Sequence, residues 1–527
     1  MVPIQKLSRL CFRANLTITE LMLVKVGSAA LHGIDGVPVS VEVDVSRGLP
    51  SFTTVGLPDS SVRESKDRVR AAIKNCGYEV PSRKITVNLA PADIKKEGPS
   101  FDLPIALGLL AATGIISPQM LKGYLAVGEL SLDGSLLPVS GALSIAITAS
   151  EVGYTSVIVP LENGREALLT DSIKIVAVSN LYQIVEILNG VRQAETLNIN
   201  QDLSVPGRYQ VGFEDIKGQT GVKRALAIAA AGMHNIVMEG TPGTGKTMLA
   251  KSIPSIMADW TLDERLETTR IYSIIGKEKK FDLLNHRPFR SPHHTISDAG
   301  LIGGGTYPRP GEVSLAHNGV LFLDELPEFR KHVLEVLRQP MEDGLVTLSR
   351  AQASLTYPSR FMLVAAMNPC PCGYLGDGIN RCRCTEQQIR NYKSKISGPL
   401  LDRIDMQLVV SGIDFDKADQ KSDTETSAQV RSLVSEAMSI QAERFKSIDE
   451  IHTNAQMGVR EIEKYCQINL DAKRLLTKSV KRLGLSPRAF HKILKVARTI
   501  ADLNGNEHID NGHVAEAVQY RRGEVLT

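Results

Sequence analysis

The sequence has no hydrophobic run of the length that a membrane span requires. No apolar stretch in its 527 residues approaches the roughly 18 residues that cross a bilayer as a helix. Residues 1–21 carry Lys6, Arg9 and Arg13 but no sustained apolar segment and no cleavage site, so they do not resemble a secretory signal. We therefore expect a cytoplasmic protein with no membrane partner, in which residues 1–21 are a disordered extension or precede the true start at Met22.

The chain also lacks a strong net charge, which is +3 from 61 basic and 58 acidic residues. A surface that binds nucleic acid therefore has to be local rather than spread over the whole protein. No low-complexity tract and no internal repeat occurs. The composition is that of an ordinary globular protein, and a chain of this length divides into about two to four domains.

Cysteine is scarce and unevenly distributed. Four of the seven cysteines lie within 15 residues, as Cys370-X-Cys372 and Cys382-X-Cys384. In a reducing compartment such a cluster indicates a metal site rather than disulfides. Four thiolates close a tetrahedral Zn²⁺ site with no open position, so the zinc is predicted to be structural. Four free cysteines in a loop are the alternative.

The segment 240–247 is a complete phosphate-binding loop. Its glycines let successive backbone N–H groups close around phosphate oxygens, Lys246 reaches the outer phosphates, and the hydroxyl of Thr247 binds Mg²⁺. A strand-like run precedes the loop and a helix-like segment follows it, so a helix dipole points at the phosphates. The residues predicted to bind ATP here are Gly240, Thr241, Pro242, Gly243, Thr244, Gly245, Lys246 and Thr247.

Two further apolar segments end in polar side chains. The run 320–323 ends in Asp324, which we expect to hold the Mg²⁺ shell, and Glu325, which we expect to polarise the attacking water. The run 361–367 ends in Asn368, whose amide is able to orient that water, with a strand-capping role as the alternative. The sequence therefore predicts a protein that binds and hydrolyses a nucleoside triphosphate.

Short strand-like and helix-like segments alternate over residues 22–190, which predicts an α+β domain. The period-2 pattern of 37–45 predicts a half-buried strand, and the composition of 60–75 predicts a helix with a charged face. Further strands are expected at 85–90, 124–129 and 156–160, and further helices at 102–114 and 141–152. The chain from 417 onward is charged and helix-forming, which predicts a helical lid.

Two later arginines complete a recognisable order of motifs. Arg403 lies in the turn 398–405, where a surface salt bridge is the simplest interpretation, and Arg488 follows Ser486-Pro487 at the start of a helix. With the segment 213–219, the motifs described above and Asn368, they follow one another as in AAA+ ATPases. More narrowly, residues 22–525 resemble the magnesium-chelatase-like AAA+ ATPases of the YifB/ComM family. The segments that carry this likeness are 290–295, 303–305, 311–319 and 370–373.

The resemblance implies a multidomain α/β fold and a ring, a homo-hexamer. Arg403 is then an arginine finger inserted into a neighbouring subunit, and Arg488 is the sensor 2 arginine. The implied parts are a Lon-protease-like (ribosomal S5-like) α+β domain at 22–190, a linker at 191–211, an AAA+ core with the four-cysteine insertion at 212–415, and the helical lid at 416–527.

The amino-terminal domain resembles Lon proteases but lacks their catalytic pair. The segment 96–102 matches the Lon serine segment and supplies Ser100, whereas the match at 128–139 brings Leu143 to the position of the Lon lysine. A leucine is unable to accept the serine proton, so we expect no peptidase activity. A protein partner is the expected ligand of this domain.

The resemblance also implies that loops facing the pore of the ring touch single-stranded or branched DNA. The candidate phosphate contacts are Arg287 and Arg290 before a glycine-rich turn, Arg350 on a hairpin expected at 344–357, and Arg381, Arg383 and Lys395 near the cysteines. A solvated charged loop is the alternative for the last three. His293 and His294 lack a carboxylate partner in the sequence, so we do not expect a metal there.

Three functions are compatible with these motifs. The first is an ATP-driven DNA motor with branch-migration or helicase activity in DNA recombination or transformation. The second is a chelatase-like motor that remodels a partner protein, although chelatase motor subunits lack this amino-terminal domain and the four cysteines. The third is an ATP-dependent protease, against which Leu143 counts.

Overall fold

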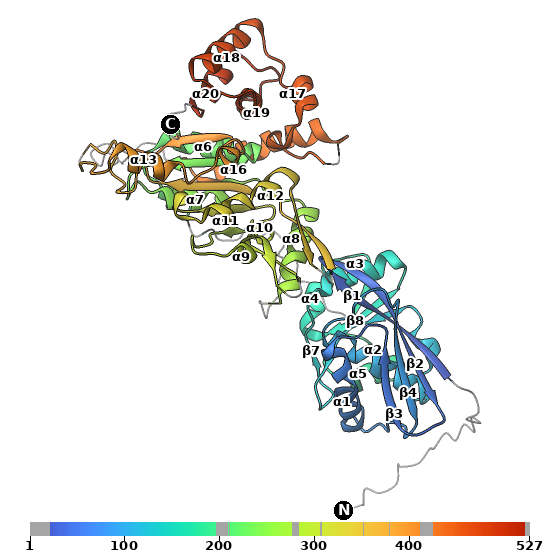
Figure 1. Cartoon of the computed structure of the whole chain (residues 1–527). Helices are drawn as coiled ribbons and strands as arrows, with labels where there is room; N and C mark the ends of the chain where they lie inside the picture. The colour runs from blue at the N-terminus through green and yellow to red at the C-terminus, as the bar shows by residue number, and fades with distance from the viewer. Residues whose placement is uncertain are drawn as a thin grey trace, which may run out of the picture. The chain divides into compact units, whose positions relative to one another are not determined.

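The computed structural model describes residues 22–195, 209, 211–276, 284–305, 308–350, 353–378, 380–411, 425–448 and 450–521. The chain forms two compact units that divide after Ile199, except that His32–Ile34 belong to the second (Figure 1). The extension expected at 1–21 and most of the linker expected at 191–211 lie outside the described residues, and the finer domain boundaries stay predictions. Among the described residues, no helix combines the length and apolar character of a bilayer span.

A seven-stranded sheet in the order β3-β4-β2-β1-β5-β8-β9 forms the centre of the first unit. Its inner strand β2 buries Val39, Val41 and Val43 while the residues between them stay partly exposed, as the period-2 pattern predicted. The strands are β1 (Met22–His32), β2 (Asp35–Ser46), β3 (Ser51–Val55), β4 (Lys84–Ala90), β5 (Tyr124–Ala126), β8 (Ser156–Pro160) and β9 (Lys174–Val178).

Helices of the first unit fall into two apolar clusters. One cluster contains α1, α2 and α5, and the other contains α3 and α4. Because alternate residues of β5 and β8 belong to different clusters, the two groups lie on opposite faces of the sheet. The bounds are α1 (Ser60–Asn75), α2 (Asp102–Ala112), α3 (Ala142–Val152), α4 (Gly164–Ala167), α5 (Leu181–Leu188), and the short turns η1 (Pro99–Phe101), η2 (Pro118–Leu121) and η3 (Leu161–Asn163).

The single strand expected at 124–129 is wrong. The chain forms β5 and then a separate β6 (Glu129–Leu130), which pairs with β7 (Leu136–Leu137) in a two-stranded sheet. The break falls at Gly128, whose N–H donates to the carbonyl of Ser100 instead of to a sheet neighbour. A side chain at Gly128 would lie within 2.4 Å of Leu136, so glycine permits this close packing.

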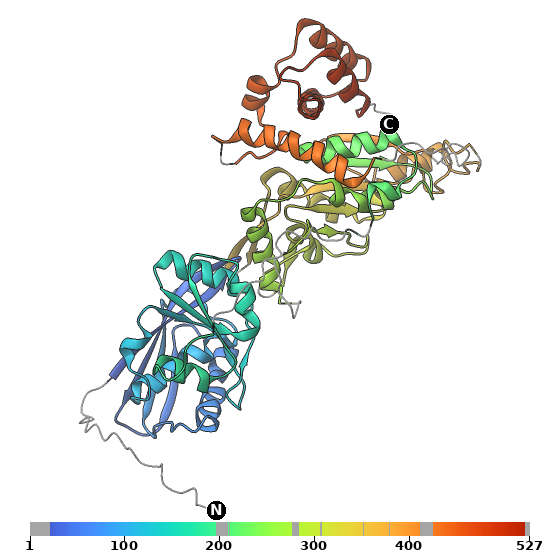
Figure 2. The ribbon, with the colours of Figure 1, turned by 180° about the vertical axis from the view of Figure 1, so that it is seen from behind.

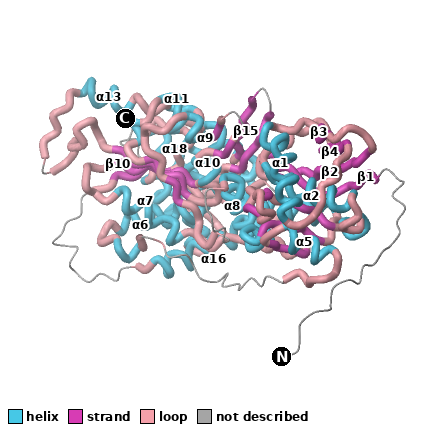
Figure 3. The backbone as a smooth tube through the Cα atoms, turned by 90° about the horizontal axis from the view of Figure 1, so that it is seen from below, coloured by secondary structure: helices cyan, strands magenta, loops and turns pink. Residues whose placement is uncertain are grey.

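The second unit contains a five-stranded sheet of order β11-β14-β17-β10-β18, in which every pair is parallel. Its inner strands are apolar on both faces because helices cover both. Figure 3 shows these strands in magenta beside α6 and α7. The strands are β10 (Ile236–Glu239), β11 (Phe289–Arg290), β14 (Val320–Leu323), β17 (Met362–Met367) and β18 (Met406–Val409).

Short strands and helices surround this sheet. The predicted hairpin is confirmed as β15 (Leu345–Arg350) paired antiparallel with β16 (Ala353–Pro358). The remaining elements up to residue 411 are η4 (Phe213–Asp215), α6 (Thr220–Gly232), α7 (Lys246–Ile256), α8 (Leu262–Ile275), α9 (Asp298–Ile302), β12 (Gly303–Gly304), β13 (Arg309–Pro310), α10 (Glu312–Leu315), η5 (Leu326–Glu328), α11 (Lys331–Glu335), α12 (Arg338–Asp343), α13 (Glu386–Lys393) and α14 (Gly398–Leu401).

Helix α16 (Ser427–Phe445) packs against α6 and α7 beside the five-stranded sheet. The predicted helical lid at 416–527 includes this helix. Figure 2 shows this long orange helix alongside the green helix α6. Its Gln441 donates to the carbonyl of Ala231, and Ser427 accepts from the N–H of Phe213. The carboxy-terminal helices share the same apolar cluster. They are η6 (Asn454–Gln456), α17 (Val459–Tyr465), α18 (Leu470–Arg482), α19 (Pro487–Leu503) and α20 (Asn511–Gln519).

Candidate nucleotide site

Three neighbouring strands bring the phosphate-loop residues and their polar partners together. In the sheet, β17 lies between β10 and β14. The loop 240–247 follows β10, Asp324 and Glu325 follow β14, and Asn368 follows β17. Because all three strands are parallel, their carboxyl ends lie at one edge, where open α/β sheets bind ligands.

The loop has the backbone shape that phosphate binding requires. Gly243 and Gly245 both adopt φ +83°, a left-handed conformation that glycine reaches without strain, and α7 begins at Lys246. The Nζ of Lys246 donates to the carbonyl of Gly240 at 2.6 Å and to Oδ1 of Asn368 at 3.2 Å. Burial lowers the pKa of Lys246, and Asp324 opposes that shift. Lysine, loop and Asn368 therefore form one hydrogen-bonded group.

Thr247 and Asp324 form the pair expected to bind Mg²⁺. The hydroxyl of Thr247 donates to Oδ2 of Asp324 at 2.9 Å, across a separation of 77 residues. A hydroxyl and a carboxylate are oxygen ligands of the kind that Mg²⁺ accepts, so these residues fit the ion. Glu325 has a backbone φ of +54°, which is unusual for a residue other than glycine. Its N–H donates to Oδ1 of Asp324. Its own carboxylate is half-exposed beside them.

Two residues of this site were missed by the sequence analysis. Nδ1 of His294 lies 3.5 Å from Oε2 of Glu325, a contact between distant segments that no local pattern signals. Glu239 ends β10 directly before Gly240, and burial raises the pKa of its carboxyl to about 7, opposed by Lys393 and Lys246. A carboxylate within the apolar run 236–239 was the available signal for this residue.

The four cysteines have the geometry of a zinc site. Sγ of Cys370 lies 3.4 Å from Sγ of Cys372 and 3.7 Å from Sγ of Cys382, and all four sulfur atoms lie within 4.8 Å of one another. A tetrahedral site with Zn–S bonds of about 2.3 Å has sulfur atoms about 3.8 Å apart. Backbone N–H groups of Tyr374 and Arg383 lower the pKa of Cys372 to about 6, whereas desolvation and the neighbouring thiols raise the pKa values of Cys382 and Cys384.

This cluster lies against the phosphate loop. Gly373 has φ +87°, and a side chain there would come within 2.7 Å of the ring of Pro242. The same glycine donates its N–H to the carbonyl of Cys370. Cys370 also follows Asn368 by two residues, so the cluster touches both the loop and the end of β17.

The two arginines lie at the other edge of the sheet. The carbonyl of Arg403 accepts from Asn235, which precedes β10, whereas the phosphate loop follows it. The four residues of β10 separate these edges by about 13 Å. Nη1 of Arg488 lies 3.7 Å from Oδ2 of Asp402, the neighbour of Arg403. Neither arginine is therefore brought to the phosphate loop of its own chain.

The arginine turn is held by buried and partly exposed ion pairs. Arg403 donates to the carbonyl of Pro399 at 2.6 Å and pairs with Glu342 at the end of α12. Next to it, the buried Asp405 accepts from Nζ of Lys492 on α19 at 2.7 Å. Although burial raises the pKa of Asp405, Lys492 and His234 hold it well below its usual range. The turn is thus bonded to both α12 and α19.

Two of the expected DNA contacts, Arg287 and Arg290, are bonded within the protein. The prediction that Arg287 contacts DNA is wrong, because this residue is only 3% exposed and donates to the carbonyls of Ala258 and Asn318. Arg290 lies on β11 and donates twice to Glu312, at 2.6 and 2.7 Å. Their segment forms an edge strand of the sheet instead of a projecting loop.

The other expected contacts have mixed outcomes. Lys395 lies 3.4 Å from Glu328, whereas Arg381 and Arg383 are exposed, and no ion pair to them is found among the described residues. The backbone of Arg350 ends β15, but its side chain is outside the described structure, so its role stays a prediction.

The adjacent histidines are bonded within the described fold, and His294 has a carboxylate neighbour, Glu325, that the sequence did not reveal. The rings of His293 and His294 lie 4.1 Å apart, and Nδ1 of His293 bonds to the hydroxyl of Thr295. Within the described part of the chain, the four-cysteine cluster is the group whose ligand atoms converge closely enough for a metal ion.

The position of the Lon lysine is occupied by Leu143 in this chain. Leu143 lies buried on α3, and its N–H donates to Glu166. Lys96 is itself buried and donates to the carbonyls of Pro91 and Ile94, the latter at 2.7 Å. These carbonyls occupy the ammonium group of Lys96. Lys96 therefore does not take the role of the lysine that Lon proteases pair with their serine.

Replacing Ser100 by alanine is expected to leave ATP turnover and stability within about 0.5 kcal/mol of wild type, since no reaction depends on its hydroxyl. The wild-type protein should not degrade casein with or without ATP. Casein fragments on a gel that vanish in the Ser100→Ala protein would contradict this prediction.

A partly buried acid predicts how stability depends on pH. Oε2 of Glu267 on α8 lies 2.9 Å from His317 and 2.6 Å from Arg360. Burial raises its pKa, but these two partners lower it to about 2, below the usual 4.5. A depressed pKa stabilises the fold above pH 4.5, and this contribution is lost as the pH falls toward 2.

The Glu267→Gln protein should therefore lose up to about 3 kcal/mol of unfolding free energy at pH 7. Its deficit relative to wild type should shrink as the pH falls below 4.5. Urea unfolding at several pH values measures both, with Glu463→Gln, an exposed acid, as the control. An equal deficit at every pH would contradict the assignment.

Comparison with known proteins agrees with this geometry. Residues 212–418 match magnesium chelatase, subunit ChlI; residues 41–163 match subunit ChlI of Mg-chelatase; and residues 424–521 match its C-terminal region. The competence protein ComM of Haemophilus influenzae is 44% identical over 503 residues, 95% of this chain and 97% of that protein. The uncharacterized protein YifB is 44% identical in Salmonella typhimurium, over 95% of this chain and 97% of that protein.

The YifB protein of Escherichia coli is 43% identical over 500 residues, which cover 94% of this chain and 96% of that protein. Such identity extends over both units and over the segments that hold the phosphate loop, the cysteines and the arginines. The chain therefore belongs to the magnesium-chelatase-like family of YifB and ComM.

Proposed function

We propose that this protein is a ring-forming AAA+ ATPase that couples ATP hydrolysis to the remodelling of DNA. The observation that carries the ATPase part is the joint placement of Lys246, Thr247, Asp324 and Asn368 at the ends of three parallel strands, with bonds of 2.9 and 3.2 Å between them. This is the arrangement that binds phosphates and Mg²⁺ on one side of an attacking water.

Each residue then has a role set by its position. Lys246 and the N–H groups of the loop hold the phosphates, while Thr247 and Asp324 hold Mg²⁺, which neutralises charge on the phosphate oxygens when bound. Glu325 accepts a proton from water that Asn368 orients. His294 lies 3.5 Å from that carboxylate and holds it near the loop.

The opposite edge of the sheet supports an assembly. Arg403 lies at the end of β10 opposite its own phosphate loop, and Arg488 lies beside Asp402 of the same turn. In a ring, that edge faces the loop of the next subunit, and both arginines supply positive charge to its transferred phosphate. A homo-hexamer is the assembly proposed, by likeness to AAA+ proteins.

A structural Zn²⁺ is part of the proposal. Cys370, Cys372, Cys382 and Cys384 would hold it with four thiolates, and no reaction step passes through it. Because Gly373 lies against Pro242, the metal keeps the phosphate loop and the end of β17 in register.

DNA is the proposed substrate for two reasons. A relative with 44% identity is named a competence protein, and competence concerns the uptake of DNA. The second reason is the four-cysteine cluster, which chelatase motor subunits are expected to lack. The amino-terminal unit does not separate the two functions, because residues 41–163 match subunit ChlI of Mg-chelatase. Branch migration or helicase activity in recombination or transformation, in the cytoplasm, is the activity proposed. A chelatase-like motor acting on a protein partner through the first unit is the second candidate, supported by the match over 212–418.

ATP turnover with added single-stranded, duplex and branched DNA tests the choice. Stimulation by DNA, strongest with a branched junction, is the expected result. Unchanged turnover with every DNA at low salt would leave the protein-remodelling function as the better account.

A further inference from the structure

Helix α18 (Leu470–Arg482) concentrates positive charge in a chain that is otherwise nearly neutral. It carries five basic residues and one acid, a net charge of +4, so the remaining residues of this +3 chain sum to −1. The basic residues are Lys473, Arg474, Lys478, Lys481 and Arg482, and the acid is Asp471. The local basic surface that nucleic-acid binding requires is thus present on this helix.

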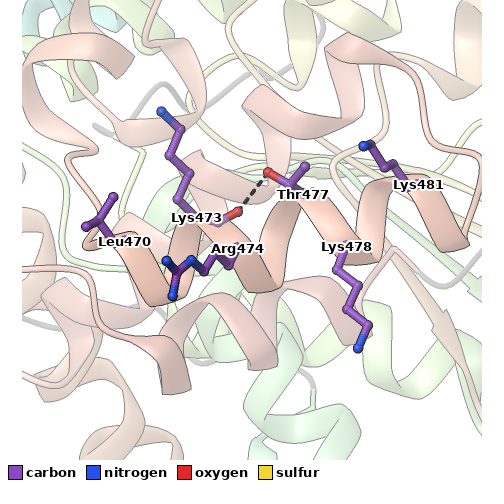
Figure 4. Close-up of a pocket in the computed structure, with 6 residues that line it drawn as sticks. All are labelled: Leu470, Lys473, Arg474, Thr477, Lys478 and Lys481. Carbon is purple, nitrogen blue, oxygen red and sulfur yellow. Dashed lines mark hydrogen bonds between the residues drawn. The ribbon is translucent and has the colours of Figure 1, made fainter.

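The charge lies on one face, and the opposite face is packed. Ala472 and Leu476 are fully buried, and α18 packs against α20. All five basic side chains are exposed. Figure 4 shows Lys473, Arg474, Lys478 and Lys481 projecting from the helix, while Thr477 bonds back to the carbonyl of Lys473 at 2.8 Å. The face presented to solvent is therefore basic along its whole length.

Almost none of this charge is neutralised within the protein. Among the described residues, the ion pair found on this face joins Arg474 to Asp471 at 3.6 Å, and both side chains are exposed. Arg474, Lys478 and Arg482 follow one another at four-residue intervals, so they are about 6 Å apart along the axis. Like charges at this spacing destabilise an isolated helix. An anion outside the described fold would remove that cost.

We propose that the exposed face of α18 binds the sugar-phosphate backbone of DNA, a contact that rests on the DNA-remodelling function proposed above. Charge complementarity selects this ligand. The basic groups form an open row about 14 Å long instead of converging on one point, which suits a long polyanion with repeating phosphates.

This face also supplies free positive charge that three of the DNA contacts expected from the sequence do not supply. Arg287, Arg290 and Lys395 have carboxylate partners in the fold, so their charge is already matched. Lys473, Lys478, Lys481 and Arg482 have none at salt-bridge distance among the described residues. Since lysine and arginine contacts to phosphate carry no base information, binding through α18 is independent of sequence.

The test removes three charges from α18 in the full-length protein. Lys478→Gln, Lys481→Gln and Arg482→Gln are combined, and binding of a fluorescein-labelled duplex is measured by anisotropy from about 50 to 200 mM salt. Binding at the lowest salt should weaken about tenfold or more, and the slope of log K against log salt should flatten by about 2.7, or about 0.9 per contact. Basal ATP turnover without DNA should equal wild type, because α18 lies outside the nucleotide site.

A matched variant separates this surface from a general charge effect. Arg63→Gln, Lys66→Gln and Lys74→Gln remove the same charge from exposed positions of α1 in the first unit, and this protein should keep the wild-type slope. Equal binding by both variants would overturn the role of α18 while leaving the DNA function intact. No binding by the wild type would overturn both. An α18 variant that fails to assemble in sedimentation would instead show an interface between copies, and would also overturn the proposal.

Discussion

Replacing Arg403 by alanine is expected to lower ATP turnover by about 10³-fold or more while leaving nucleotide binding intact. The arginine lies at the sheet edge opposite the phosphate loop, where its carbonyl accepts from Asn235. In the proposed ring it serves the site of a neighbouring subunit rather than its own. Steady-state ATPase assays measure the loss, and binding of a fluorescent nucleotide measures the retained affinity.

Mixing two inactive proteins gives the sharper result. In Glu325→Gln subunits the site is inactive but the arginine is intact, and in Arg403→Ala subunits the reverse holds. Mixed rings therefore contain some interfaces with both groups, and turnover should partly return. No recovery at any ratio, in rings shown to mix, would contradict action between subunits.

Glu342 offers a matched control for the same turn. It pairs with Arg403 at the end of α12, and that bond lowers the pKa of Glu342. Glu342→Gln keeps the arginine and removes only its ion pair, so turnover should stay within a few-fold of wild type. A loss as large as that of Arg403→Ala would mean that the ion pair itself, rather than the arginine, sustains hydrolysis.

Removing the zinc ligands is expected to have the second largest effect. The protein should contain one Zn²⁺ per chain by elemental analysis, and Cys382→Ser with Cys384→Ser should contain none. Structural zinc binds to peptides with about 10–16 kcal/mol at pH 7, so its loss releases the segment 370–384. Because Gly373 contacts Pro242, displacement of the phosphate loop should lower turnover by about 10²-fold.

Cys76→Ser serves as the control for this experiment. Cys76 is a free, half-buried thiol in the first unit, far in sequence from the cluster. Its replacement should change neither the metal content nor the turnover. Purified wild-type protein without stoichiometric metal, with all four thiols of the cluster freely alkylated, would show that the cysteines are not a zinc site.

Local chemistry was readable from the sequence where function depends on neighbours in the chain. The loop 240–247 needs its glycines and Lys246 in one short segment, and Asp324 and Asn368 each end an apolar run. Strand ends in a parallel sheet meet at one edge, so their convergence followed once the strands were recognised. The four cysteines were visible for the same reason, because a metal knuckle closes within 15 residues.

Which basic side chains are available to a ligand depends on contacts between distant segments of the folded chain. Arg287 and Arg381 both look like exposed basic residues in the sequence. In the fold Arg287 is buried and donates to the carbonyls of Ala258 and Asn318, whereas Arg381 is exposed. The basic residues of α18 are equally visible in the sequence. Their availability depends on what packs beneath the helix and on their pairing, which among the described residues is the single ion pair of Arg474 with Asp471. Such pairings join segments that are distant in the chain, and periodicity carries no information about them.

The position of the arginines shows the same division. The nucleotide loop, its two carboxylates and the cysteine cluster are visible in the sequence, because each is a short pattern with its own chemistry. Tertiary structure decided that Arg403 and Arg488 lie at the edge away from that loop, that Gly373 contacts Pro242, and that His294 faces Glu325. These distances are set by strand order and packing, which arise only when the whole chain has folded.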